Sequence, residues 1–243
     1  GFFIGLYIIS LPLFSFREGY YMLTNLIAGI TVLLFLVKVL LNNGRMKISP
    51  FFFFFFTFIV FGAFTYLYAI NKEYVLQQSI TLFLNAILCL AIYNYIDNRN
   101  KIEILMKYFI CGNILAILVL YFTTNIFSGD RVGSILGNVN MIAMFLGIST
   151  IFTIYFTLKY KKYIYILLCV IFILFILLTG SRKGVLLLIL YFPIYIISVS
   201  KKRFIGILKS ILVISLIGGF FIFIVSNNSL IDQIIGKRFN SLL

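Results

Sequence analysis

Apolar stretches of about 20 residues, separated by short polar breaks, recur along the chain and constrain its fold more than any other feature. A helix of about that length crosses the ~30 Å hydrocarbon core of a bilayer with every backbone polar group satisfied. The sequence therefore predicts an all-α, polytopic transmembrane helical bundle. We expect about nine spans in one incomplete transmembrane domain, residues 1–243. The expected spans are 1–14, 20–41, 49–70, 75–96, 102–124, 138–158, 163–179, 184–200 and 205–225.

The composition is typical of a membrane protein and argues against other classes. Hydrophobic residues make up 63% of the chain and charged residues 11%, whereas a soluble domain is about 25% charged. The net charge of +14 comes from cations scattered between spans, so we expect the lipid bilayer as partner and no nucleic acid. Histidine, the commonest general base, does not occur. The three cysteines fall within spans without a CxxC pair, and we expect them to be small buried residues.

The charges differ between the two sides of the membrane. One set of alternate polar breaks, with its flanks, carries 13 cations and two acids, and the other set carries seven cations and four acids. Because cytoplasmic loops are enriched in lysine and arginine, the first set is predicted to be cytoplasmic. The N-terminus is then inside, and the tail from residue 226 is outside.

Two neighbouring cations break this pattern in the stretch "LLTGSRKGVLLL". Arg182 and Lys183 lie on the predicted outer side without an acid nearby, and Ser181 before them is a natural N-cap. Cations in the first turn of a helix oppose its dipole, whereas the same end with added cations suits an anion such as phosphate. The alternative is that both side chains only anchor the span at the membrane interface.

The preceding outer loop has the same design. In "GDRVGSILGNVNMIAMF", Arg131 lies between glycines, Asn138 is a candidate N-cap, and Asn140 sits near the same helix start. Two inward-running helices thus each begin with a polar cap and an arginine at one membrane face. If these ends meet, they form a phosphate-binding site. A local Asp130–Arg131 ion pair and simple capping remain the alternatives. Lys237 and Arg238 lie on the same predicted side, just beyond the last span, and either add to this site or belong to an ordinary polar tail.

These segments resemble the O-antigen ligase and O-antigen polymerase family of bacterial envelope enzymes. The resemblance covers residues 129–243 and rests on the arginine at 131, the "GNVN" helix start, the "SRKG" turn and the "KRF" at 237–239. Val139 stands where the family usually has proline, and the family's histidine-containing outer loop is not in this sequence. We therefore expect a fragment that lacks the C-terminal part.

The resemblance implies a GT-C-like membrane glycosyltransferase with a polyprenyl-diphosphate-linked oligosaccharide as donor and a glycan or lipid as acceptor. By position, Arg131 and Arg182 would be catalytic, binding the diphosphate and stabilising the leaving group's charge. The donor-binding residues would be Asn138, Asn140, Ser181, Lys183 and Arg238. Because the outer acids are isolated, we expect no metal and no cofactor.

Several functions remain open at this point. The first is a polymerase of a surface polysaccharide, such as a capsule or exopolysaccharide, in the bacterial cytoplasmic membrane. The second is a ligase that transfers the glycan to a lipid acceptor. A flippase for lipid-linked oligosaccharides is less favoured, because the spans carry almost no polar groups besides Asn85 and Asn113. A non-catalytic scaffold predicts that Arg131 and Arg182 point apart.

Overall fold

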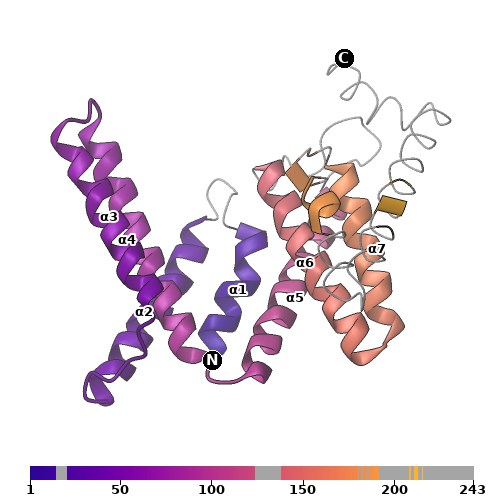
Figure 1. Ribbon diagram of the computed structural model, residues 1–243, viewed down its shortest axis with the longest axis horizontal. Coiled ribbons are helices and arrows are strands. Elements are labelled where there is room, and N and C mark those ends of the chain that lie inside the picture. Colours follow the sequence, from indigo (N-terminus) through magenta and orange to yellow (C-terminus); the bar gives the residue numbers. More distant parts are fainter. Residues whose placement is uncertain are drawn as a thin grey trace. The chain divides into compact units, whose positions relative to one another are not determined.

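The computed structural model describes residues 1–14, 21–123, 138–179, 181, 183–184, 186–191, 208, 211, 212 and 215. Within these ranges the chain forms helices and no strand (Figure 1). The described residues belong to two compact units. One is Gly1–Ser10 with Tyr21–Tyr108, and the other is Leu11–Tyr20 with Phe109–Leu243.

Among the described residues, five helices are long and apolar enough to cross a membrane, which confirms a multi-pass helical membrane protein. They are α2 (Tyr21–Leu41), α3 (Pro50–Phe64) with the 3-10 turn η1 (Thr65–Leu67), α4 (Lys72–Tyr95), α5 (Arg99–Thr123) and α6 (Val139–Tyr160). Helices α1 (Phe2–Phe14) and α7 (Tyr163–Leu178) are apolar but shorter. Most of the expected spans 184–200 and 205–225 lies outside the described residues. Nine spans and a GT-C-like arrangement therefore stay predictions.

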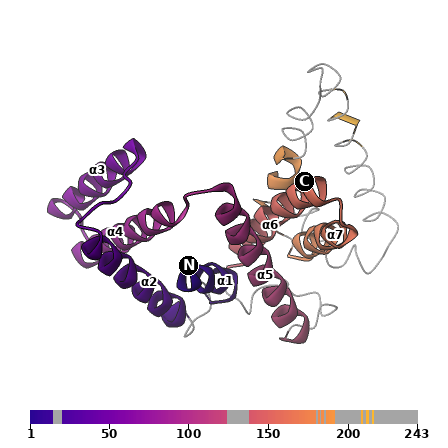
Figure 2. The same cartoon turned by 90° about the horizontal axis from the view of Figure 1, so that it is seen from below.

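The first unit is built around α4, which lies beside both α2 and α3 (Figures 1 and 2). Local sequence signals set the helix starts. The Ser49 hydroxyl accepts a hydrogen bond from the amide of Phe51, with Pro50 at the first helical position, and Asn71 caps α4 through the amide of Tyr74. The phenylalanine run of α3 faces two ways, because Phe52 is buried whereas Phe51, Phe53 and Phe54 are exposed.

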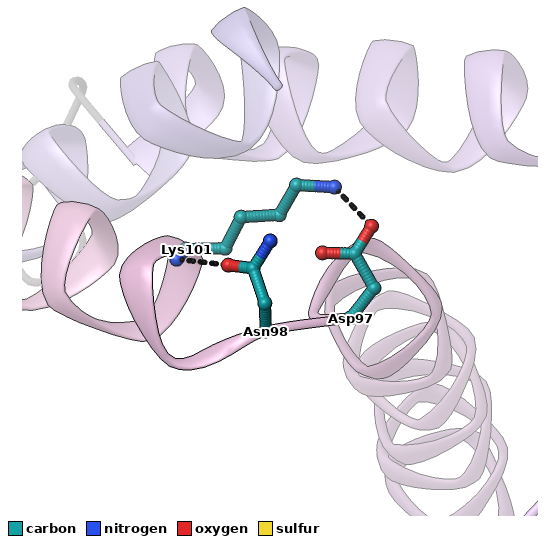
Figure 3. Close-up of polar contacts among 3 residues, drawn as sticks. All are labelled: Asp97, Asn98 and Lys101. Carbon is teal, nitrogen blue, oxygen red and sulfur yellow. Dashed lines mark hydrogen bonds and ion pairs between the residues drawn. The ribbon is translucent and has the colours of Figure 1, made fainter.

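The connection between α4 and α5 is polar (Figure 3). Asn98 accepts a hydrogen bond at 3.0 Å from the backbone amide of Lys101, and Asp97 pairs with the ammonium of Lys101 at 2.6 Å. The hydrogen bond between the Lys101 ammonium and the Asp97 carboxylate is the main cause that lowers the pKa of Asp97. The pair therefore favours an ionised carboxylate at this helix start.

In the second unit, α6 and α7 form an antiparallel helical hairpin. The connection is only Lys161 and Lys162, and Lys161 ends α6 in the left-handed region with φ 52°. Phe156 is fully buried; its ring stacks on that of Tyr160 and is tilted against that of Tyr165, with ring centroids 5.7 and 5.3 Å away. Three aromatic rings thus pack together at the end of the hairpin next to the connection between α6 and α7.

The expectation that the cysteines are buried is wrong for two of the three. Cys89 in α4 and Cys111 in α5 are exposed, and Cys169 in α7 is partly exposed. An apolar residue in a membrane helix can face either protein or lipid, since lipid tails are as apolar as a protein core. Low polarity therefore did not predict burial at these positions.

Candidate functional site

Asn138 begins α6 as expected from the sequence. Its backbone is extended, with φ −84° and ψ 104°, and its side-chain oxygen accepts a hydrogen bond from the amide of Asn140 at 3.0 Å. Its carbonyl receives the amides of Met141 and Ile142 at 3.0 and 3.1 Å. The cap predicted at Asn138 is confirmed, and α6 starts here with valine where the resembled family has proline.

The turn after α7 is held by two buried hydroxyl groups. Thr179 is fully buried, donates to the carbonyl of Ile176 at 2.6 Å, and accepts the amide of Ser181 at 3.2 Å. The Ser181 hydroxyl accepts the amide of Gly184 at 3.3 Å, three residues later. Lys183, Gly184 and residues 186–191 are helical. Ser181 is therefore an N-cap, as predicted, and Lys183 lies in the first turn.

The two helix starts meet. The Ser181 hydroxyl donates to the side-chain oxygen of Asn140 at 2.9 Å, across 41 positions of sequence. One turn further, a Cβ on Gly184 would lie 2.7 Å from the Cβ of Ala143, and beyond it Leu187 reaches to 2.8 Å from a Cβ on Gly147. Successive contacts advance in the same direction along both segments. Residues 183–184 and 186–191, called the 183–191 segment below, thus pack parallel to α6, with both N-termini at the same end.

This arrangement concentrates positive potential at one place. Two parallel helix N-termini lie side by side, and each carries a partial positive charge. Lys183 is exposed in the first turn of its helix, and it forms no ion pair with any described residue. The Asn140 side chain is only partly buried, its oxygen accepts a hydrogen bond from the Ser181 hydroxyl, and its amide nitrogen has no acceptor among the described residues. The site can bind an anion from the N-terminal end.

The structure brings together four of the seven predicted site residues. Asn138, Asn140, Ser181 and Lys183 lie at these paired helix starts. The other three predicted residues, Arg131, Arg182 and Arg238, lie outside the described residues. Their predicted roles stay predictions.

Sequence reasoning missed the residues that bring the helices so close. Gly184 and Ala143 touch where no larger side chain fits, and Gly147 makes room for Leu187. A signal for this contact was present, because Ala143 and Gly147 are four residues apart and form the small-xxx-small pattern of close membrane helices. Thr179 was also missed, although a hydroxyl two residues before the cap is well placed to bond the turn.

Other polar groups of this unit lie inside its helices. Asn113 is 1% exposed, and its side-chain oxygen has no partner among the described residues, although its amide donates to the carbonyl of Phe109 at 3.0 Å. The hydroxyl of Ser149 in α6 is likewise buried without a partner in the described part of the chain. No three metal-binding side chains lie together in the described ranges.

Comparisons with protein-family models, with curated proteins and with solved structures found no match for this chain. The resemblance to the O-antigen ligase and polymerase family therefore rests on the motifs at residues 129–140, 177–190 and 237–239. The physical evidence for a function is the geometry of the paired helix starts.

Proposed function

We propose that this chain is part of a membrane glycosyltransferase that acts on polyprenyl-diphosphate-linked glycans and polymerises the repeat units of a surface polysaccharide. One observation carries the proposal: the Ser181 hydroxyl and the Asn140 side chain join two parallel helix starts at 2.9 Å. The enzyme would work at the outer face of the bacterial cytoplasmic membrane, the side to which the positive-inside rule assigns both helix starts.

The chemistry of the donor fits such a site. A diphosphate carries negative charge and many acceptor oxygens, and helix N-termini offer free amides to such groups. Lys183 adds a full positive charge, and Asn140 adds amide hydrogens. The polyprenyl chain would remain in the membrane, so the donor needs to be bound mainly at its diphosphate.

The proposed reaction is a transfer of the glycan to an acceptor hydroxyl. The acceptor oxygen attacks the anomeric carbon, the bond from that carbon to the diphosphate oxygen breaks, and the polyprenyl diphosphate leaves with the bonding electrons. The acceptor's proton passes to a general base. By the resemblance, Arg131 and Arg182 stabilise the charge that grows on the leaving group, because guanidinium binds phosphate oxygens in pairs.

The test compares Lys183 with a matched lysine in the same unit. Lys162 is also exposed and lies at a helix start, but at the opposite end of the α6–α7 hairpin. In the full-length gene, K183Q is expected to lower polymer formation about 10²-fold, the usual effect of removing one charge-stabilising donor, whereas K162Q leaves it unchanged. The measurement is the chain length of the surface polysaccharide on a gel, with membrane expression checked by immunoblot.

The same experiment includes N140A, R131A and R182A. Each is expected to reduce long chains to single repeats while the protein still inserts. If K183Q, R131A and R182A all give wild-type chains, the cations are interfacial anchors and the proposal is wrong. A ligase differs only in the acceptor. If the chain is part of a ligase, these variants leave chain length unchanged but stop the attachment of glycan to lipid.

A flippase is the second candidate function. Asn113 and Ser149, both buried with unpaired oxygens among the described residues, favour it, because transporters carry polar groups within their spans. A flippase predicts that loss of function leaves lipid-linked repeats on the inner leaflet. A polymerase predicts single repeats that are accessible from outside.

A further inference from the structure

The turn between α2 and α3 and the end of α4 line a partly open, basic cavity of about 350 Å³ in the first unit. Three cations line it, together with two asparagines and three apolar side chains. The lining residues are Phe35, Lys38, Val39, Asn42, Arg45, Met46, Lys47 and Asn94. None of the three cations forms an ion pair with a described residue, although Lys47 contributes to lowering the pKa of Asp97.

Backbone hydrogen bonds fix the conformation of the turn that lines this cavity. Asn43 and Gly44 are in the left-handed region, with φ 55° and 74°, and their amides bond the carbonyls of Leu40 and Val39 at 3.2 and 2.9 Å. This is the hydrogen-bond pattern of a Schellman motif, which ends α2 at a defined angle.

A second set of contacts fixes the other wall. The Asn94 side chain accepts the backbone amide of Lys47 at 2.7 Å and donates to its carbonyl at 3.0 Å. It also donates to the carbonyl of Leu90 at 2.9 Å. These contacts tie the turn to the end of α4 through backbone atoms, so the side chain of Lys47 is left to face the cavity.

A second, mainly apolar cavity of about 130 Å³ shares Phe35, Lys38 and Asn94 with the first. Its other lining residues include Phe3, Ile4, Leu34 and Ala91, with the hydroxyl-bearing Thr31 and Tyr95. Along α2 the two cavities together extend from Thr31 to Asn42, about 16 Å at 1.5 Å per residue. A charged space thus continues into an apolar one.

We propose that these cavities bind one anionic phospholipid, with its phosphate among Lys38, Arg45 and Lys47 and the start of an acyl chain beside Leu34 and Ala91. A space of 350 Å³ is about a dozen water volumes, which suits a glycerophosphate headgroup. Basic pockets between membrane helices on the cytoplasmic side bind such headgroups, and the positive-inside rule assigns this turn to that side. The C-terminal dipole of α2 accounts for Lys38 alone, since Arg45 and Lys47 lie beyond the helix.

The test measures binding of dioleoyl phosphatidylglycerol to the purified chain by native mass spectrometry, with phosphatidylcholine of the same chains as the neutral reference. R45Q/K47Q keeps Lys38 and all backbone contacts of the turn. It is expected to weaken phosphatidylglycerol binding roughly thirtyfold, from about fivefold per cation. The control K161Q/K162Q also removes two exposed cations from a loop on the predicted cytoplasmic side and is expected to change binding less than twofold. Equal weakening by the two variants, or none by R45Q/K47Q, overturns the proposal.

Two further arms separate a lipid from a free phosphate and guard against misfolding. Inorganic phosphate and glycerol phosphate, at the same concentration, are expected not to raise the thermal unfolding midpoint, whereas phosphatidylglycerol raises it. L34W fills the apolar cavity from a residue that is 44% exposed, so the fold tolerates it, and it is expected to weaken phosphatidylglycerol binding with all cations present. If inorganic phosphate matches the lipid, or L34W binds it as wild type does, the site is not a lipid site.

Discussion

Gly184 gives the sharpest test of how the two helix starts pack. A Cβ at this position would lie 2.7 Å from the Cβ of Ala143 and 3.0 Å from Cγ2 of Ile176, whereas carbon atoms prefer about 3.5–4.0 Å. Ala143 belongs to α6 and cannot move without its helix, so G184A must push the segments apart. Overpacking of this kind costs about 1–3 kcal/mol in the free energy of unfolding.

The matched control is Gly29 in α2, where a Cβ would meet nothing within 4 Å. G29A is expected to stabilise the protein by about 0.5–1 kcal/mol, because alanine loses less backbone entropy in a helix. The two glycine-to-alanine changes should therefore differ by about 1.5–4 kcal/mol, although each adds one methyl group.

A double variant separates the proposed contact from other effects. A143G/G184A exchanges the methyl group between the helices, so most of the loss should return and leave a coupling of about 1–2 kcal/mol. Unfolding is measured as the loss of helical circular dichroism when sodium dodecyl sulfate is added to the protein in mixed micelles. If G184A is as stable as G29A, or the coupling is zero, the 183–191 segment does not lie on α6.

Three further predictions follow from the charges and polar groups. Lys101 lowers the pKa of Asp97, so the pair stabilises the folded state above the usual carboxyl pKa, and this stabilisation is lost as pH falls through the lowered pKa. The thermal unfolding midpoint of the wild type should therefore exceed that of D97N at pH 6 and equal it near pH 2. In intact cells with other cysteines removed, I70C should react with a membrane-impermeant maleimide and N43C should not, and reaction of N43C alone would reverse the assigned orientation. N113L replaces a buried, partly unpaired amide with an apolar side chain. If the protein is a polymerase, N113L should still form polymer and should be at least as thermally stable as the wild type. If N113L folds but forms no polymer, a transport function is favoured.

Much of the fold could be predicted from hydropathy and caps. The apolar stretches gave α2 to α6 to within a few residues, and the capping residues Asn138 and Ser181 mark their helix starts as the sequence indicates. These features are local: a span depends on its own length, and a cap depends on residues within one turn.

Side-by-side packing was harder to predict. Hydropathy does not distinguish the face of a membrane helix that meets protein from the face that meets lipid, and Cys89 and Cys111 show the resulting error. For the site, the sequence predicted that two helix starts share one membrane face, but the Ser181–Asn140 bond depends on a tertiary contact that one sequence does not specify. The need for glycine at position 184 can be recognised only when Ala143 is known to lie opposite it.

The contact between Lys47 and Asn94 also bears on how the protein is made. The two residues are 47 positions apart, so at about 5–20 residues per second the ribosome needs roughly 2–9 s to add the second after the first. During that interval α2 and α3 can already be in the membrane, yet the turn between them has no partner for the backbone groups of Lys47. The basic cavity can therefore form only after the end of α4 has been synthesised, and any lipid it holds is acquired late in the biogenesis of the first unit.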